Sequence, residues 1–193
     1  MEHVQKNCII VHGCEYDAEH AVLLEQRTAE NHWTTWVRDE LVKRGVSAQT
    51  PTMPTSWAQE YEGFKKEFEK YHVNENTVLV GHSCSCSFLV RWLGETKQKI
   101  AKLVLVAPWK VFDPYDTVRA AFYTYDIDET IVNRVGDIVM FTADNESDDG
   151  KKSLEIFHHA LGGRIIALSG RGHYRTREWE KSAFPELLEE ILA

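Results

Sequence analysis

Segment 81–85 carries a serine between two stretches of different character, and it reads Gly-His-Ser-Cys-Ser. The apolar run Thr77–Val80 precedes it, and apolar residues at helical spacing follow it. A strand, a tight turn with a serine at its apex and then a helix form the geometry called a nucleophile elbow. Such a turn strains the serine backbone and needs small neighbours, which Gly81 and Ser85 supply. The segment therefore predicts that Ser83 is an activated nucleophile.

A serine hydroxyl is a weak nucleophile until a neighbouring base removes its proton, and that base is usually a histidine oriented by a carboxylate. The chain has nine histidines. His173 stands apart because it lies in the glycine-rich stretch 169–174, directly after the last apolar run. A loop of this kind can hold an imidazole over the carboxyl ends of the strands, where open α/β folds bind their ligands. We predict that His173 is the base.

The acidic partner of the histidine is expected in the loop that follows the apolar run Ile138–Phe141. Residues 142–149 of that loop include four carboxylates. Asp144 lies closest to the strand end and is the more usual residue type. The longer side chain of Glu146 can reach the same imidazole from two residues further on. We favour Asp144 slightly and keep Glu146 as its rival for the same role.

Acyl transfer also needs two backbone N–H donors for the oxyanion. The first candidate is the N–H of Cys84, directly after the nucleophile. The second is the N–H of Cys14, in the sequence Val-His-Gly-Cys after the first apolar run. Cys14 and Cys84 would then be neighbours, and their side chains would be either incidental or a source of sensitivity to oxidation. His12 and His82 flank predicted strand ends and are expected to shape the site; His12 and Trp109 are expected to line the substrate pocket.

Strand and helix patterns alternate along the chain. Five apolar runs are continuous, as expected for strands covered on both faces of a parallel sheet. They are Cys8–Val11, Thr77–Val80, Leu103–Val106, Ile138–Phe141 and Ile165–Leu168, with a weaker sixth candidate at Val46–Thr50. Helix-period segments lie between them, and an aromatic stripe at positions 57, 61, 64, 68 and 71 predicts a buried helix face. This alternation predicts an α/β domain with a doubly wound, mostly parallel sheet of about six strands flanked by helices.

One domain is expected over residues 1–193, a length that can bury a substantial core. Within it, the segment 108–135 has no clear strand pattern and carries several aromatic residues among aspartates. Long connections of this kind often have a function. We therefore expect a lid or a wall of the substrate pocket in this segment.

The charge balance limits the classes of partner. Twenty-two basic residues stand against thirty acidic residues, for a net charge of −8, and the basic residues form no stripe. Because nucleic-acid binding requires clustered Lys and Arg, we expect no nucleic acid as a partner. No stretch approaches the roughly 18 to 20 apolar residues of a membrane span, and the N-terminal residues lack the layout of a secretory signal. We expect a cytoplasmic protein, a monomer or a weak homo-oligomer, with a small-molecule acyl substrate.

The four cysteines, Cys8, Cys14, Cys84 and Cys86, each lie in or beside a predicted core element. Free cysteine behaves there as a small apolar residue. We therefore expect reduced thiols rather than disulfides, in keeping with a cytoplasmic location. No set of cysteines and histidines has the spacing of a zinc site, so we expect no metal, and the proposed chemistry requires no cofactor.

Together these motifs resemble the α/β-hydrolase superfamily, and within it the small serine hydrolases of the YdeN-like and retinoblastoma-binding-protein types. The matching pieces span nearly the whole chain and are Ile9–Gly13, Trp33 and Trp36 with Glu40-Leu41, Pro51-x-Met53-Pro54, Val80–Ser83 and Gly172–Tyr174. The order of nucleophile, acid and histidine along the chain is also that of the superfamily. The resemblance implies a compact sheet of about six strands with little or no cap, and serine-hydrolase chemistry without a named substrate.

Two departures from the pattern of this family affect the site. The elbow ends in Ser85, where the family usually has glycine. The acid loop lacks the proline that usually follows the family's aspartate. One placement puts Glu146 at the position of the family's acid, and another puts Asn145 there with Asp144 beside it. The resemblance therefore carries over Ser83 and His173 and leaves the acid open.

The sequence as a whole predicts a serine hydrolase, specifically a carboxylesterase that acts on small acyl esters through an acyl-enzyme. A thioesterase or an acyltransferase would share that intermediate and differ in the acyl donor or acceptor. The alternative from another class is an α/β-hydrolase-fold protein that binds a ligand or a partner protein and turns nothing over. Covalent reaction of Ser83 separates these two hypotheses.

Overall fold

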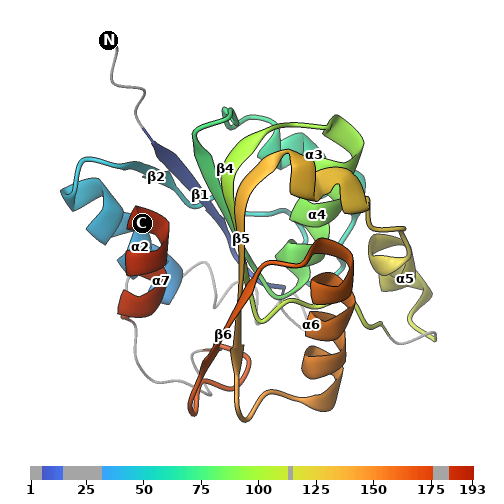
Figure 1. Cartoon of the computed structure of the whole chain (residues 1–193). Helices are drawn as coiled ribbons and strands as arrows, with labels where there is room; N and C mark the ends of the chain where they lie inside the picture. The colour runs from blue at the N-terminus through green and yellow to red at the C-terminus, as the bar shows by residue number, and fades with distance from the viewer. Residues whose placement is uncertain (1–5, 15–31, 113–114, 176–182) are drawn as a thin grey trace.

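A parallel sheet forms the centre of the molecule in the computed structural model, which describes residues 6–14, 32–112, 115–175 and 183–193 (Figure 1). Its strands within these residues are β1 (Asn7–Val11), β2 (Ser47–Gln49), β3 (Thr77–His82), β4 (Ile100–Val106), β5 (Val135–Ala143) and β6 (Arg164–Leu168). Their order across the sheet is β2-β1-β3-β4-β5-β6, and every neighbouring pair is parallel. The predicted doubly wound sheet of about six strands is confirmed, and the weaker sixth candidate forms the edge strand β2.

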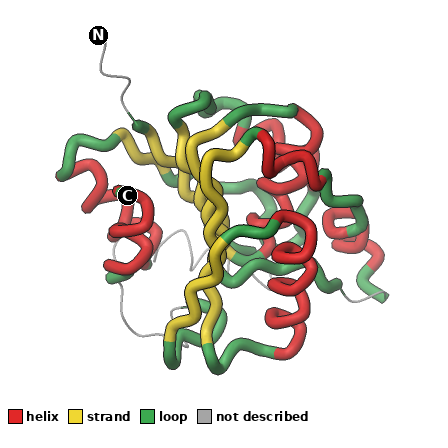
Figure 2. Tube along the Cα trace, in the orientation of Figure 1, coloured by secondary structure: helices red, strands yellow, loops and turns green. Residues whose placement is uncertain are grey.

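Helices cover both faces of the sheet. They are α2 (Trp33–Lys43), α3 (Tyr61–Phe68), α4 (Cys84–Thr96), α5 (Thr117–Tyr123), α6 (Asp148–Leu161) and α7 (Pro185–Leu192), with a 3-10 helix, η1, at Glu129–Asn133. Figures 1 and 2 show α2 and α7 on one side of the sheet and α3 to α6 on the other. None of these described helices has the length and apolar character needed to cross a membrane.

The strands contribute to two separate cores, because successive side chains of a strand point to opposite faces. Ile9 and Leu79 are fully buried in the core on the α4 side. Ile10 and Val80, one residue along each strand, are fully buried on the other side, in the core that contains Trp33 of α2. Burial on both faces explains why these strands are continuous apolar runs in the sequence.

The aromatic stripe expected between residues 57 and 71 is helical only in its middle. Tyr61, Phe64 and Phe68 are buried on α3, as the stripe predicts. Trp57 lies before the helix because the chain is still turning there, after a residue with a φ of 45° at Thr55. The helix therefore begins about one turn later than the spacing of aromatic residues suggests.

The segment 108–135 connects β4 to β5 and contains α5 and η1; residues 113 and 114 lie outside the described residues. Its first residues are tied to the end of α5, since Lys110 Nζ donates to the carbonyl oxygens of Tyr123 and Tyr125. Phe122 packs edge-on against Phe64 of α3, with ring centroids 5.3 Å apart. The described part of the segment is therefore packed on the fold, and a lid movement stays a prediction.

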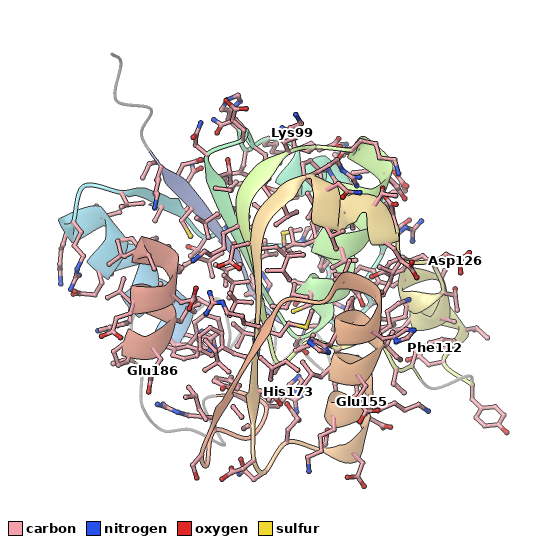
Figure 3. All side chains as sticks on the ribbon, viewed as in Figure 1. Lys99, Phe112, Asp126, Glu155, His173 and Glu186 are labelled. Atoms are coloured by element: carbon pink, nitrogen blue, oxygen red, sulfur yellow. A yellow bond between two sulfur atoms is a disulfide. The ribbon has the colours of Figure 1, made fainter. Side chains whose placement is uncertain are left out.

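The strands run in one direction, so the loops at their carboxyl ends meet at one edge of the sheet (Figure 1). The loops after β1, β3, β5 and β6 carry the residues expected to do chemistry. Figure 3 places His173 at this edge. The fold therefore brings together positions that are far apart in the sequence.

Candidate active site

Ser83 occupies the apex of the turn between β3 and α4. β3 ends at His82 and α4 begins at Cys84, so one residue makes the connection. The backbone of Ser83 has a φ of 55° and a ψ of −122°, a conformation that residues other than glycine rarely adopt. Its N–H donates to the carbonyl oxygen of Val106 at the end of β4 (2.9 Å), which holds the turn against the sheet. This is the geometry of a nucleophile elbow, which exposes a side chain at the top of the sheet.

The close approach of β3 and α4 explains the small residues around the serine. A Cβ on Gly81 would lie 3.0 Å from the backbone nitrogen of Cys86. Ser85 is fully buried, and its hydroxyl donates a hydrogen bond to the carbonyl oxygen of His12. A glycine at position 85 has no hydroxyl to donate. The departure from the family's pattern therefore ties the elbow to the loop after β1.

Three side chains from three loops form a hydrogen-bonded chain at the edge of the sheet. His173 Nε2 lies 2.8 Å from Ser83 Oγ, and His173 Nδ1 lies 2.8 Å from Glu146 Oε2. Each of the three residues is at most 8% exposed. When Nδ1 donates its proton to the carboxylate, Nε2 is left to accept the proton of the serine hydroxyl. The arrangement is that of a nucleophile, a base and an orienting acid.

Asp144, the acid that the sequence slightly favours, lies elsewhere in the same loop. Its exposed carboxylate accepts hydrogen bonds from Ser169 Oγ (2.6 Å) and from the N–H of Gly170 (2.8 Å). The structure thus places the carboxylate of Glu146, and not that of Asp144, against the imidazole. The reason is the path of the chain, because β5 ends at Ala143 and the loop then turns back, with the N–H of Glu146 donating to the Ala143 carbonyl (3.2 Å).

Consecutive residues of the loop after β5 each hold a different part of the loop after β6, which carries His173. The contacts are Asp144 with the N–H of Gly170, Asn145 Oδ1 with the N–H of Gly172 (2.8 Å), and Glu146 with the ring of His173. Gly170 and Gly172 have φ values of 68° and 53°, which glycine adopts without steric cost. The whole stretch 144–146 therefore positions His173, with Glu146 alone at the imidazole.

A second histidine holds the backbone of His173. His82 Nε2 donates to the carbonyl oxygen of His173 (2.9 Å). The ring of His82 packs edge-on against Trp33, with centroids 5.4 Å apart. Trp33 Nε1 donates in turn to the carbonyl oxygen of Tyr174 (3.0 Å). The backbone of the histidine loop is thus fixed at two successive carbonyl groups.

Burial and hydrogen bonding set the charges in the site. Burial favours a higher pKa for Glu146, but the hydrogen bond and charge of His173, together with the N–H of Ser147 (2.8 Å), outweigh it and hold that pKa below its ordinary value. Burial lowers the pKa of His82 well below its ordinary value. At neutral pH, Glu146 is therefore a carboxylate and His82 is neutral. The negative charge beside His173 is available to stabilise an imidazolium.

The loop after β1 lies directly against the nucleophile. A Cβ on Gly13 would lie 3.2 Å from Ser83 Cβ. His12 holds this loop, because its Nδ1 lies 2.7 Å from the carbonyl oxygen of Gly13 and its Nε2 accepts from the N–H of Met53 (2.9 Å). On the other side, Cys84 is the first residue of α4, so its N–H has no partner within the helix. The loop and the helix start thus flank Ser83, as two oxyanion donors must.

Cys14 and Cys84 form a disulfide, with Cα atoms 5.9 Å apart. The expectation of four reduced thiols is wrong for this pair, while Cys8 and Cys86 are free and buried. The two bonded residues are 70 positions apart in the sequence. They meet because β1 and β3 are neighbouring strands, so the loops that follow them are neighbours too. The expected proximity of the two cysteines thus appears as a covalent bond.

A cavity of about 520 Å³ opens beside the imidazole. Its lining residues are Trp109, Asn145, Glu146, Ser147, Gly172, His173 and Arg175. Trp109 stands edge-on to His173, with centroids 5.2 Å apart and an interplanar angle of 87°. The N–H of Trp109 donates to the carbonyl oxygen of Ser83 (3.2 Å), and Ser87 Oγ donates to the carbonyl oxygen of Trp109 (2.6 Å). Trp109 is therefore held between the nucleophile and the cavity, whereas His12 is not among the residues that line this cavity.

The cysteines, histidines and carboxylates of this region form no metal site. Within the described ranges, no group of three or more His, Cys, Asp or Glu side chains is placed to hold a metal ion. The groups that are present, a hydroxyl, an imidazole and a carboxylate in series, suit nucleophilic attack on an acyl carbon.

The sequence as a whole matches a known family. The model of the family described as serine hydrolase covers residues 25–187, a range that includes Ser83, Glu146 and His173. The chain belongs to the serine hydrolase family. Hydrolysis is therefore its class of reaction.

This serine hydrolase is also similar to individual proteins. It is 29% identical over 84 residues to the hydrolase YdeN of Bacillus subtilis (strain 168), a match that spans 42% of this chain and 44% of YdeN, less than half of either. The crystal structure of the ydeN gene product from B. subtilis covers 97% of both chains, with a TM-score of 0.82 and 18% identity. The carboxylesterase CesB (YbfK) from Bacillus subtilis has a TM-score of 0.54 and 10% identity, over 98% of this chain and 83% of that one. The predicted α/β-hydrolase fold and the predicted likeness to YdeN are confirmed.

Two features of this serine hydrolase's site were not predicted. The bond from His82 to the carbonyl of His173 depends on the path of a loop 91 residues away, and no local pattern indicates it. For the disulfide, the sequence carried one signal: Cys14 follows the His-Gly pair and Cys84 follows Ser83. That signal predicted proximity, whereas both thiols were expected to be reduced.

Proposed function

We propose that this serine hydrolase is a carboxylesterase that cleaves small acyl esters through an acyl-enzyme on Ser83. The observation that carries the proposal is the pair of 2.8 Å contacts that link Ser83 to His173 and His173 to Glu146. These contacts join a strained serine at a helix start to a buried carboxylate through one imidazole. No metal or cofactor is needed for this chemistry.

The first half of the reaction forms the acyl-enzyme. His173 Nε2 takes the proton of Ser83 Oγ as the oxygen attacks the carbonyl carbon of the ester. Glu146 keeps the Nδ1 proton in place and stabilises the imidazolium that forms. The imidazolium then gives its proton to the leaving alcohol as the carbon–oxygen bond breaks. Water, deprotonated by His173, attacks the acyl-enzyme in the second half and releases the acid.

The oxyanion of each tetrahedral intermediate is held by two backbone amides. The N–H of Cys84 is one donor, at the positive end of the α4 dipole. The N–H of Cys14 is the other, in the loop whose Gly13 lies against Ser83. Donors fixed in advance at this position are worth a factor of roughly 10² to 10³ in kcat each.

The cavity supports a small acyl substrate. Its volume of about 520 Å³ is in the range of small-ligand sites. Trp109 forms an aromatic wall beside the imidazole. A thioester or an acceptor other than water would use the same acyl-enzyme.

The non-catalytic alternative loses its main support. The main support for that hypothesis was the departure of residues 144–147 from the family's pattern, which would leave His173 without an acid. Glu146 lies at the imidazole and is 5% exposed, so the loop supplies a buried acid.

A cytoplasmic location and a monomeric or weakly self-associating state remain predictions of the sequence.

The test is covalent labelling of the purified protein with a fluorophosphonate, followed by intact mass spectrometry. Wild type is expected to gain one adduct, and Ser83→Ala none. Turnover is then measured with short-chain esters and matched thioesters, with an added alcohol as competing acceptor. The proposal is rejected if the folded wild type gains no adduct, or if Ser83→Ala is labelled to the same extent as the wild type.

A further inference from the structure

The disulfide joins the two residues proposed as oxyanion donors. Cys14 follows Gly13, which contacts Ser83, and Cys84 follows Ser83 itself. A covalent bond between their side chains therefore sets the separation of the two backbone segments that carry the donors. The Cα atoms are 5.9 Å apart, within the ordinary range for a disulfide.

Other contacts hold the start of this loop. Ser85 Oγ donates to the carbonyl oxygen of His12, and the N–H of Met53 donates to His12 Nε2. Both contacts act on residue 12. The disulfide acts on residue 14, two positions further along, where the donor is proposed. Breaking it would leave the loop attached at His12 while releasing Cys14 from the elbow.

The two cysteines differ in exposure. Cys84 is 1% exposed, whereas Cys14 is partly exposed. An external thiolate therefore attacks Cys14 Sγ, and the bonding electrons pass to Cys84 Sγ as the leaving thiolate. That thiolate forms at the first residue of α4, where the N-terminal amides stabilise negative charge. A stabilised leaving thiolate makes the exchange faster.

The two free cysteines are poor partners for this exchange. Burial raises the pKa of Cys8 and that of Cys86. The Cys86 thiol also donates to the carbonyl oxygen of Gly81 (3.2 Å). Since the thiolate is the attacking species, both stay inert thiols. Reduction of the Cys14–Cys84 bond thus requires a reductant from outside the chain.

We propose that Cys14 and Cys84 form a reversible redox site that controls the oxyanion hole, with the disulfide form active and the dithiol form impaired. The proposal rests on the esterase function proposed above. The reductant is a dithiol: its first thiolate forms a mixed disulfide at Cys14, and its second thiol displaces Cys14 and closes the reductant's own disulfide. Two electrons and two protons pass to the protein, which ends with two thiols. Disulfides of this transient kind are the ones found in reducing compartments.

Reduction has two effects on catalysis. The Cys14 donor is no longer fixed before the substrate arrives, so its preorganisation is lost. A Cys84 thiolate would also place negative charge beside the developing oxyanion. We expect the rate of ester turnover and of fluorophosphonate labelling to fall about tenfold or more, because removal of one such donor costs roughly 10² to 10³ in kcat.

The experiment compares the purified full chain before and after dithiothreitol, with the reductant removed. Alkylation under denaturing conditions, weighed by mass spectrometry, should modify Cys8 and Cys86 in the oxidised protein and all four cysteines in the reduced one. Labelling of Ser83 and ester turnover should fall on reduction and recover on reoxidation with oxidised glutathione. Circular dichroism checks that the reduced protein stays folded.

Matched variants separate the switch from general thiol effects. The double variant Cys14→Ser/Cys84→Ser should label and turn over ester at the rates of the reduced wild type, and dithiothreitol should not change these rates. Cys8→Ser should respond to dithiothreitol as the wild type does. The switch is rejected if reduced and oxidised wild type label at the same rate, if reduction accelerates labelling, or if oxidation leaves four alkylatable cysteines. Failure of the esterase proposal looks different, because Ser83 would then be unreactive in both states.

Discussion

Gly150 lies directly against the carboxyl group of Glu146. A Cβ at position 150 would lie 2.6 Å from Glu146 Cδ and 2.7 Å from its Oε1. Gly150 belongs to the first turn of α6, and its N–H donates to Ser147 Oγ (3.2 Å). The missing side chain at this helix position leaves the space in which Glu146 reaches His173.

Gly150→Ala is therefore expected to lower kcat by about tenfold or more, because a small displacement of a catalytic group has a large effect on rate. The same change removes a glycine from a helix, which by itself favours the folded state by about 0.5–1 kcal/mol. Activity and stability should thus be measured together, by ester turnover and thermal unfolding. Gly63→Ala in α3 is the matched control, since its Cβ would meet other atoms only at 3.7 Å or beyond. Unchanged turnover in Gly150→Ala would contradict the tight fit around Glu146.

Glu146→Gln and Asp144→Asn test the identity of the acid. Loss of the charge at the imidazole removes the partner that fixes its tautomer, so Glu146→Gln should lower kcat by about 10³- to 10⁴-fold. Asp144→Asn keeps an oxygen for the N–H of Gly170 and should change kcat by only a few-fold. The kcat values for one ester, measured side by side, decide the point. A larger loss in Asp144→Asn would return the acid to the residue that the sequence favours.

Gly13→Ala tests the loop beside the nucleophile. A Cβ there would lie 2.7 Å from His82 Nδ1 and 3.2 Å from Ser83 Cβ, so the loop must move away from the elbow. We expect kcat to fall by at least about tenfold because the oxyanion donor of Cys14 moves with the loop. The fluorophosphonate labelling rate should fall in parallel, while circular dichroism stays that of the wild type. Labelling at the wild-type rate would show that this loop does not contribute a donor.

His82 is expected to act as a positioning residue for His173. His82→Leu removes the donor to the His173 carbonyl, whereas His82→Gln can still offer an N–H. We expect kcat to fall roughly 10- to 100-fold in the leucine variant, with KM little changed, and to recover in part in the glutamine variant. Equal kcat in both variants would mean that the hydrogen bond does not matter.

The depressed pKa of Glu146 predicts how stability depends on pH. A carboxylate with a lowered pKa in the folded state stabilises the fold above its unfolded pKa of about 4.3, and this contribution is lost as the pH falls through the folded value. The difference in unfolding free energy between wild type and Glu146→Gln should therefore be largest near neutral pH and shrink below about pH 4. Urea unfolding at several pH values measures it. Glu155→Gln is the control, because the carboxylate of Glu155 on α6 is exposed. The prediction is contradicted if the difference in unfolding free energy between wild type and Glu146→Gln grows as the pH falls.

The local sequence was enough to predict the strands and two of the three side chains that meet at the candidate site. Continuous apolar runs predict buried parallel strands because both faces of each strand are covered. The tight turn between β3 and α4 leaves one position for a nucleophile, so Ser83 could be predicted as that residue without the fold. His173 follows the last strand in a glycine-rich loop, and the edge it reaches is fixed by strand direction alone.

Only the tertiary structure placed the Glu146 carboxylate at the imidazole and paired two of the cysteines. Asp144 and Glu146 differ by two positions, and the choice depends on how the loop turns after β5 and on the space left by Gly150. The Cys14–Cys84 bond depends on the pairing of β1 with β3, which brings residues 70 positions apart within bonding distance. A sequence specifies which groups can react, whereas contacts between loops follow from strand order and packing. That is why the nucleophile and base could be predicted from local pattern while their partners required the fold.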